Sequence, residues 1–272
     1  MSAPAFLAPR VLLDGMEVDL AAVLPGAHIA LEGSEARHAV KVQRLRGGER
    51  VDLVDGAGFR ARAAVAPSAS PDELAVEVLE VQQDAPRTPR LVLVQALAKG
   101  GRDEQAIETA TELGVDGVVP WEADRSIVRW TSQKVAKALD RWEKVLVAAT
   151  KQSRRAGVPR LEQPVSSRQL TERIEEWTAE GGVVLVCHEE ASASLPSAIA
   201  SAFGQARADA EARGPLVIVV GPEGGVSSEE LAAFEGAGAT PVLLGPEVLR
   251  SSTAGPAALA VANVLLGRWG AL

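Results

Sequence analysis

Residues that can form disulfides or bind metal ions are scarce in this chain. It has one cysteine, Cys187, and three histidines, His28, His38 and His188, without metal-ligand spacing. A single cysteine excludes a disulfide framework and a cysteine metal cluster, and we expect no metal site. Tyrosine is absent and aromatic residues make up 3% of the chain, so few aromatic rings are available to stack on flipped bases.

Long apolar runs and the common nucleotide-binding motifs are also missing. No run approaches the roughly 20 apolar residues that span a bilayer, and the N-terminus lacks the pattern of a signal peptide. We therefore expect a cytoplasmic protein without membrane contact. The absence of G-x-G-x-x-G, G-x-x-x-x-G-K-[ST] and G-x-S-x-G argues against a Rossmann dinucleotide site, a P-loop and an α/β-hydrolase.

Apolar residues are plentiful, and the charge is unevenly distributed. The 272 residues are 47% hydrophobic, enough for one large domain or two ordinary ones. A formal net charge of −8 argues against a general nucleic-acid coat protein. Between Arg125 and Arg160, however, ten basic residues face two acidic ones, a local charge of +8. This segment predicts a surface that contacts RNA phosphates, against the alternative of an ordinary solvated face.

The first 85 residues are predicted to form a small β-barrel. ERVDLVD, FRARAAVA and LAVEVLEV alternate like strands, DGAG is a hairpin turn, and one helix is expected over Glu35 to Leu45 with Ser34 as its cap. QQDAPRTPR, residues 82–90, reads as a linker. We therefore predict two domains, residues 1–85 and 86–272.

After Arg90, short apolar runs alternate with helical patterns. Continuous apolar runs suit strands that are buried on both faces of a parallel sheet, so the second domain is predicted to be α/β. The runs are LVLVQALA, GVVP, VVLVC, LVIVVG and TPVLLG. A helix over residues 132–149 has an apolar stripe and an opposite basic face. The last helix, about residues 254–269, is apolar nearly all round, which favours a subunit interface over burial within the same chain.

Two similar glycine turns follow strands of the second domain. VVGPEGGVSSEE and VLLGPEVLRSST both run from an apolar strand into Gly-Pro-Glu, and the turns begin 24 residues apart, at Gly221 and Gly245. Ser227 and Glu230 form a capping box, and Thr253 is placed to cap the last helix. Loops at the carboxyl ends of parallel strands bind ligands, so the two turns are predicted to share one pocket.

These motifs resemble the ribosomal RNA small subunit methyltransferase E family of the SPOUT superfamily. GPEGG, the Ser-x-x-Glu cap, LGP, LR and a Ser/Thr-rich helix start follow one another in the family's order. QALAKGGRDEQAIETATELGV, ATKQSRR and HAVKVQRLRGGERVDLVDGAG extend the similarity over both predicted domains. The resemblance implies an N-terminal PUA-like barrel, a C-terminal domain with a trefoil knot, and a homodimer.

The resemblance also implies a cofactor and a reaction. The family binds S-adenosylmethionine between its last loops and methylates N3 of a uridine in 16S ribosomal RNA of the small subunit. The implied cofactor-binding residues are Gly221, Pro222, Glu223, Gly224, Gly225, Leu244, Gly245, Pro246, Leu249, Ser251, Thr253 and Ala254.

Loss of the N3 proton leaves charge on the uracil ring, so a base or a stabilising cation is needed. Arg250 is the candidate cation, with pairing to Glu247 as the alternative, and Glu223 is a candidate base that could instead order its own turn. Family members often carry glutamate where this chain has Ser252, which argues against a base at that position.

Basic residues of both domains are candidates for RNA contact. In the barrel they are Arg37, His38, Lys41, Arg44 and Arg46, and beyond it Arg125, Arg129, Lys151, Arg154 and Arg155. Trp130 is the one aromatic residue with a possible role in RNA contact, although packing explains it better. Two alternatives stay open: a related enzyme that methylates another base or a ribose 2′-oxygen, and a non-catalytic RNA-binding assembly factor.

Overall fold

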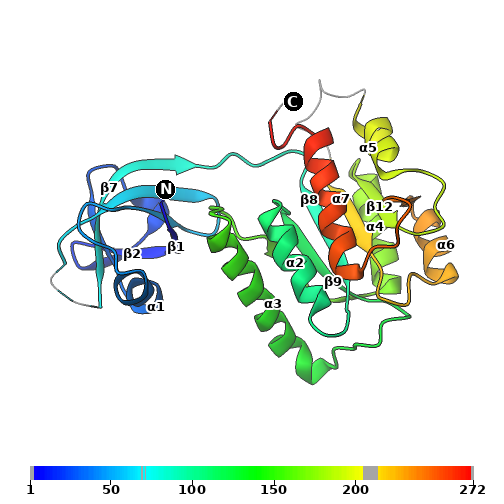
Figure 1. The fold of residues 1–272 in the computed structure, drawn as a ribbon, viewed down its shortest axis with the longest axis horizontal. Helices are drawn as coiled ribbons and strands as arrows, with labels where there is room; N and C mark the ends of the chain where they lie inside the picture. Colours follow the sequence, from blue (N-terminus) through cyan, green and yellow to red (C-terminus); the bar gives the residue numbers. More distant parts are fainter. Residues whose placement is uncertain (1–2, 69, 71, 205–213, 271–272) are drawn as a thin grey trace. The chain divides into compact units, whose positions relative to one another are not determined.

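The computed structural model describes residues 3–68, 70, 72–204 and 214–270 (Figure 1). The chain divides into two compact units. The first comprises Met1–Ala85 with Thr150–Val158, and the second comprises Pro86–Ala149 with Pro159–Leu272. Residues 150–158 pack with the first unit because their backbone pairs with it, as in the hydrogen bond from Val158 N to Gly56 O at 2.8 Å.

The first unit is built on a seven-stranded sheet in the order β1-β5-β6-β7-β4-β2-β3. β1 is parallel to β5, and the other neighbours are antiparallel. The predicted strands and the DGAG hairpin are confirmed, and alternate side chains of β5 and β6 enter the apolar core. The strands are β1 Ala5–Leu7, β2 Arg10–Leu13, β3 Met16–Asp19, β4 His28–Leu31, β5 Arg50–Val54, β6 Phe59–Val65 and β7 Leu74–Gln83.

The helix of the first unit begins earlier than predicted. α1 spans Gly33–Arg37 and continues into a wider π-helical turn over His38–Val42. Ser34 therefore lies inside the first turn, and the N-cap position is taken by Glu32, whose side chain makes no capping bond. The predicted Ser34 cap is wrong, since Gly33 enters the helix with a positive φ of 81° that glycine adopts readily.

The second unit has a wholly parallel sheet in the order β10-β9-β8-β13-β12-β14, with β11 also paired to β9. Every residue of β8 and β13 is buried, which confirms the reading of the apolar runs as strands covered on both faces. The strands are β8 Leu91–Ala96, β9 Gly117–Glu122, β10 Arg160–Leu161, β11 Val165–Ser166, β12 Val183–Cys187, β13 Leu216–Val220 and β14 Thr240–Val242.

Helices cover both faces of this sheet (Figure 1). α4 and α6 pack on one face, where Ile174, Trp177 and Phe234 meet Val94 and Val219. The helices are α2 Arg102–Glu112, α3 Ser132–Gln152, α4 Ser167–Ala179, α5 Leu195–Phe203, α6 Ser228–Gly236 and α7 Ser251–Leu265. Within the described residues, no helix combines the length and apolar character needed to cross a membrane.

α3 has the two faces predicted from its sequence. Trp142 and Leu146 are buried, and Val135 and Leu139 are half-buried along the same stripe. The basic residues on the opposite face are exposed, and two of them make ion pairs: Arg141 with Glu104 at 2.7 Å, and Lys144 with Asp140 at 2.7 Å. The apolar stripe therefore fixes the helix, and the basic face meets solvent.

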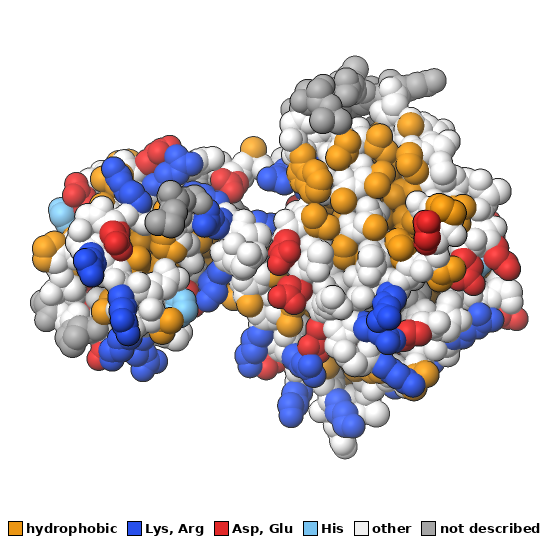
Figure 2. Space-filling view, viewed as in Figure 1, with side chains coloured by type: hydrophobic (Ala, Val, Ile, Leu, Met, Phe, Trp, Pro, Cys, Tyr) orange, Lys and Arg blue, Asp and Glu red, His pale blue; other side chains and the backbone are white. Residues whose placement is uncertain are grey.

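α7 lies against β8 and β13 and also contacts α2 and α5. Gly255 allows the close approach, since a Cβ there would lie 2.9 Å from a methyl group of Leu93. Neighbouring helices of the same chain thus cover part of α7, while Val264 and Leu265 near its end stay exposed. Figure 2 shows hydrophobic side chains gathered over this helix. The helix begins at Ser251 with Arg250 at its N-cap, so the predicted Thr253 cap is wrong.

Candidate functional site

A pocket of about 830 Å³ opens at the carboxyl ends of β12, β13 and β14. Residues 187–190, 220–226 and 243–251 supply most of its wall. β12 lies between β13 and β14 in the sheet, so the loops that follow these three strands meet at one edge. The two glycine turns predicted to share a pocket therefore do so.

Most of the predicted cofactor residues line this pocket. They are Gly221, Pro222, Glu223, Gly224, Gly225, Leu244, Gly245, Pro246, Leu249, Ser251 and Ala254, with Arg250 beside them. Thr253 is not among the lining residues, because it lies in the first turn of α7 with its side chain exposed to solvent. Ser251 Oγ is buried and has no hydrogen-bond partner within the described part of the chain.

A third wall of the pocket was not predicted from the sequence; it is formed by Cys187, His188, Glu189 and Glu190. This stretch contains no glycine and so gave no turn signal, although it directly follows the apolar run VVLVC. Arg102, at the start of α2, also lines the pocket and was not predicted. Burial raises the pKa of the Cys187 thiol to about 12, which disfavours the nucleophilic thiolate at neutral pH.

The first glycine turn is held firmly at its far end. The predicted capping box is present: Glu230 N donates to Ser227 Oγ at 3.2 Å, and Ser227 N donates to Glu230 Oε2 at 2.9 Å. Glu230 is only 3% exposed, and its other oxygen accepts hydrogen bonds from Asp124 N at 2.7 Å and from Ser167 Oγ. One buried carboxylate thus joins α6 to α4 and to the loop after β9.

Close packing explains the glycines of that turn. Gly225 has a positive φ of 73°, a conformation that other residues rarely adopt. A Cβ on Gly224 would lie 3.1 Å from the Cβ of Arg125, and the Arg125 guanidinium donates to Gly224 O at 3.1 Å. The turn therefore rests directly on the loop that carries Arg125.

Glu223 is held by neighbouring donors. Its Oε1 accepts hydrogen bonds from Arg102 Nη1 at 2.7 Å and from Lys99 N at 3.1 Å. Burial alone would raise the pKa of this carboxyl, but hydrogen bonds from its own backbone N–H, Arg102 and Lys99 outweigh that effect and lower it. A carboxylate with a lowered pKa is a weak base, so the contacts favour the alternative that Glu223 orders the turn.

Arg250 is placed differently. Its side chain is exposed at the pocket, and among the described residues no carboxylate lies within ion-pair distance of the guanidinium. The alternative in which Glu247 holds Arg250 is therefore not seen. The guanidinium is available to a ligand or substrate that enters the pocket.

The candidate RNA-binding residues fall into both units. In the first unit, Arg37, His38, Lys41, Arg44, Arg46 and Arg154 are exposed, while Lys151 and Arg155 are half-buried. In the second unit, Arg125 lines the cofactor pocket, and the Arg129 guanidinium donates to the carbonyls of Glu122 at 3.3 Å and Asp124 at 3.0 Å. Trp130 packs edge-on against Trp142 at 5.2 Å, in agreement with a packing role.

Comparison with known proteins identifies the class of protein to which this chain belongs. The family model described as RNA methyltransferase domain matches residues 86–263, and the one described as RNA methyltransferase PUA domain matches residues 31–79. The fold and the matched domains are those of an RNA methyltransferase.

Individual relatives narrow the class further. The chain is 42% identical to ribosomal RNA small subunit methyltransferase E of Mycobacterium bovis over 90% of both chains, and 31% identical to that of Bacillus subtilis over 83% of this chain and 85% of the relative. The Neisseria gonorrhoeae enzyme of this name, solved bound to S-adenosyl methionine, superposes with a TM-score of 0.76 at 26% identity over 97% of this chain and 98% of that one. This chain belongs to the ribosomal RNA small subunit methyltransferase E family.

Proposed function

We propose that this protein transfers a methyl group from S-adenosylmethionine to N3 of a uridine in 16S ribosomal RNA of the small subunit. The observation that carries the proposal is the single pocket formed by the GPEGG turn and the LGPEVLR turn. The chain is similar over 90% of its length to a relative named for methylation of small subunit ribosomal RNA. It also superposes on a relative solved with the methyl donor bound.

The residues of the pocket fit S-adenosylmethionine. A volume of about 830 Å³ lies within the roughly 300–1,000 Å³ typical of small-molecule sites. The backbone at Gly221, Gly224 and Gly225 offers polar groups to a ligand. So does Ser251 Oγ, which has no hydrogen-bond partner among the described residues, and both signs of charge are present. The implied cofactor residues that line the pocket, at positions 221–225, 244–246, 249, 251 and 254, would hold the cofactor, and the loop at 187–190 would close its third side. When bound, the cofactor supplies an activated methyl group.

The protein itself has to align the target base and manage the proton of N3. Arg250 would face the uracil and stabilise the negative charge that spreads over the ring oxygens once the proton leaves. Glu223 would hold the turn in place through Arg102 and Lys99 rather than accept a proton. The family resemblance implies glutamate at position 252, but this chain has a buried serine there, so this position supplies no carboxylate base. Catalysis would thus rest on alignment and electrostatic stabilisation.

Each domain would have its own part in this function. The first unit, residues 1–85 with 150–158, would form a PUA-like barrel that contacts RNA, and the second unit, residues 86–149 with 159–272, a SPOUT methyltransferase domain with a trefoil knot. The strand order supports the knot: β14 pairs with β12, yet α7, which follows it, packs against β8 and β13. The exposed basic residues of α3 and of the first unit support RNA contact through phosphates.

Nucleoside analysis of ribosomal RNA tests the reaction. RNA from a strain that lacks the gene should lose 3-methyluridine from the small subunit, and purified protein with S-adenosylmethionine should restore it. Loss of a different modification would identify another target atom and overturn the proposal. Absence of S-adenosylmethionine binding by the folded protein, measured by calorimetry, would instead favour the non-catalytic assembly factor.

Glu223→Gln separates positioning from base catalysis. We expect a fall in cofactor affinity of about tenfold, because the amide keeps the size of the carboxylate but loses its charge-assisted bond to Arg102. The pKa of Glu223 is lowered from 4.5, so its contacts stabilise the folded turn above that value and are lost as the pH falls through the lowered pKa. Wild-type cofactor affinity should therefore drop at acid pH, and that of the variant less so.

The turnover of Glu223→Gln and its affinity for S-adenosylmethionine, both measured over a range of pH, provide the check. If Glu223 were the base, Glu223→Gln would lose most of its turnover while keeping its affinity for S-adenosylmethionine. Glu229→Gln is the matched control, since Glu229 lies in the same segment with a lowered pKa. The hydrogen bonds from its own backbone N–H and from Ser228 lower that pKa most, and the charge of Arg125 contributes less.

We propose that the protein is a homodimer joined through the exposed end of α7. Val264 and Leu265 are 41% and 42% exposed, although both are apolar and lie in a helix that packs against the sheet. Leu265→Asp should convert the dimer to a monomer in light scattering, because an interface cannot bury an unpaired carboxylate cheaply. Met16→Asp places the same charge on an exposed apolar residue of the first unit and should leave the mass unchanged. A wild-type monomer at high concentration would contradict the proposal.

A further inference from the structure

A second pocket lies wholly within the first unit. Its volume is about 270 Å³, and it is lined by Pro4, Ala5, Glu35, His38, Gln43, Lys151, Gln152 and Arg154. The wall therefore combines the π-helical turn after α1 with the segment 150–158 that the chain returns to this unit. Two cations and one carboxylate face the pocket, which leaves a net charge of about +1 without counting His38.

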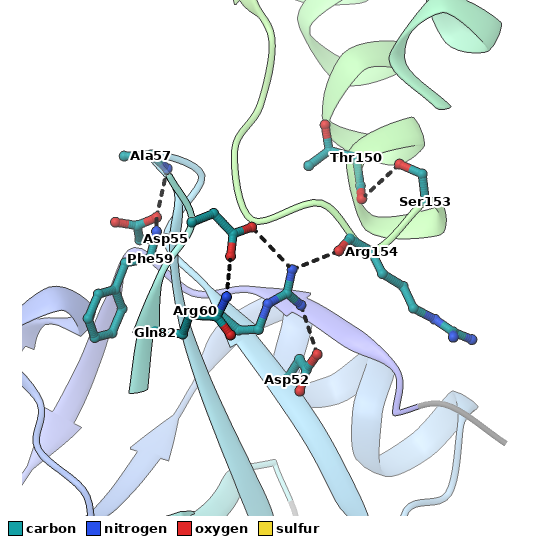
Figure 3. Close-up of polar contacts among 10 residues, drawn as sticks. Asp52, Asp55, Ala57, Phe59, Arg60, Gln82, Thr150, Ser153 and Arg154 are labelled. Atoms are coloured by element: carbon teal, nitrogen blue, oxygen red, sulfur yellow. Dashed lines mark hydrogen bonds and ion pairs between the residues drawn. The ribbon is translucent and has the colours of Figure 1, made fainter. Parts of the chain in front are cut away.

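The backbone of Arg154 is held at this pocket by Arg60, which also forms a part-buried ion pair with Asp52. Arg154 has a positive φ of 57°, which is uncommon for a residue other than glycine. Arg60 Nη2 donates to the Arg154 carbonyl at 2.9 Å, and Arg60 Nη1 donates to Asp52 at 2.8 Å (Figure 3). The Arg60 and Asp52 side chains are only 11% and 16% exposed. Figure 3 shows the Arg154 side chain extending away from these contacts, so its guanidinium is not consumed by them.

Lys151 is the second cation of the wall. Its Nζ donates to Glu35 Oε1 at 2.7 Å, and its side chain remains 29% exposed. An ammonium group has three N–H donors, so the hydrogen bond to Glu35 positions Lys151 and leaves two donors for a ligand. Because Glu35 neutralises one of the two cations, the pocket suits a single phosphate better than several.

His38 and Gln43 provide the groups that a nucleobase needs. The His38 ring meets Phe6 edge-on at 6.3 Å, and Gln43 Nε2 donates to His38 Nε2 at 3.3 Å. The ring is thus fixed while its side chain stays exposed, and the Gln43 amide keeps its oxygen and a second N–H for a ligand. Histidine rings stack on unpaired bases in RNA-binding proteins, and amides bond to the base edges.

We propose that this pocket binds one unpaired nucleotide of the substrate RNA, with its phosphate on Arg154 and Lys151 and its base against His38 and Gln43. The inference rests on the proposed function, since it takes the substrate to be RNA. A pocket of about 270 Å³ has room for a single small ligand and is too small to hold an RNA duplex. The first unit would therefore read an extruded nucleotide as well as backbone charge.

Binding of two RNA probes to the full-length protein tests this proposal. A short labelled single-stranded RNA and a blunt RNA duplex are titrated by fluorescence anisotropy over a range of salt concentrations. Arg154→Ala should weaken single-strand binding about tenfold and reduce the salt slope by about 0.7, the value for one phosphate contact on a single strand. His38→Ala should weaken single-strand binding about tenfold with the salt slope unchanged, because stacking releases no counterions. Neither variant should alter duplex binding as strongly.

The matched control is Arg62→Ala. Arg62 is an exposed cation of the same unit that pairs with Glu80 at 2.9 Å and does not line the pocket. Equal losses of RNA affinity for Arg62→Ala and Arg154→Ala, or equal losses on the single strand and the duplex, would overturn the proposed nucleotide pocket. RNA binding would then depend only on general positive charge. Calorimetry with S-adenosylmethionine is run on every variant. The wild-type protein could bind the single strand through this pocket yet neither bind S-adenosylmethionine nor methylate RNA. That outcome would contradict the proposed function but not the nucleotide pocket.

Discussion

Gly224→Val is expected to lower the affinity for S-adenosylmethionine by about 100-fold while the protein stays folded. A Cβ at this position would lie 3.1 Å from Arg125 Cβ and 3.4 Å from the Arg125 carbonyl, so the larger side chain of valine cannot be placed without movement. Overpacking of this kind costs about 1–3 kcal/mol, and each 1.4 kcal/mol is a factor of ten in affinity. The exposed turn would move more easily than the buried sheet beneath it.

Calorimetry with S-adenosylmethionine measures the loss, and thermal unfolding shows that the fold survives. Gly236→Val is the matched control, because Gly236 lies at the end of α6 where a Cβ would meet nothing within 4 Å. This control should bind the cofactor like the wild type, and its thermal stability should be unchanged or slightly higher, because valine has a higher helix propensity than glycine. Wild-type affinity in Gly224→Val would show that the glycine turn is structural and does not contact the cofactor.

Local patterns predicted the strands β5–β9 and β12–β14 and the two glycine turns of the pocket, whereas β1–β4, β10 and β11 were not predicted. β8 and β13 are continuous apolar runs, and burial on both faces of a parallel sheet demands such runs. The capping box of Ser227 and Glu230 depends on residues three apart, so the sequence alone defines it. The loop at 187–190 was missed because its place in the site depends on β12 lying between β13 and β14. Strand order is set by tertiary packing and not by neighbouring residues.

The predicted caps failed for a related reason. Ser34 and Thr253 are good capping residues, but the helices start earlier, at Gly33 and Ser251. At Gly33 the positive φ turns the chain into the helix, and at Ser251 the burial of the next turn against the sheet favours an early start. The segment 150–158 was likewise assigned to the second domain from sequence continuity, whereas Gly157 pairs with Gly56 in the first unit. Long-range pairing of this type leaves no local signal.

Arg250→Ala is expected to reduce the rate of methyl transfer by about 10²–10³-fold, the usual effect of removing one group that stabilises developing negative charge. Cofactor affinity should change little, because the guanidinium is exposed and makes no ion pair among the described residues. Single-turnover methylation of small subunit RNA measures the step, and Arg168→Ala is the control. Arg168 is an exposed arginine of α4 that pairs with Glu172 at 3.1 Å and does not line the pocket.

The pH dependence of the Arg250→Ala deficit identifies the role of this residue. If Arg250 stabilises the uracil anion, the variant should recover toward the wild-type rate as the pH rises, because alkaline solution removes the N3 proton without help from the protein. A deficit in RNA affinity alone, with an unchanged rate at saturation, would contradict this role. Arg250 would then contact an RNA phosphate, and the charge at N3 would have to be stabilised by Arg102 or Arg125, the other two arginines of the pocket wall.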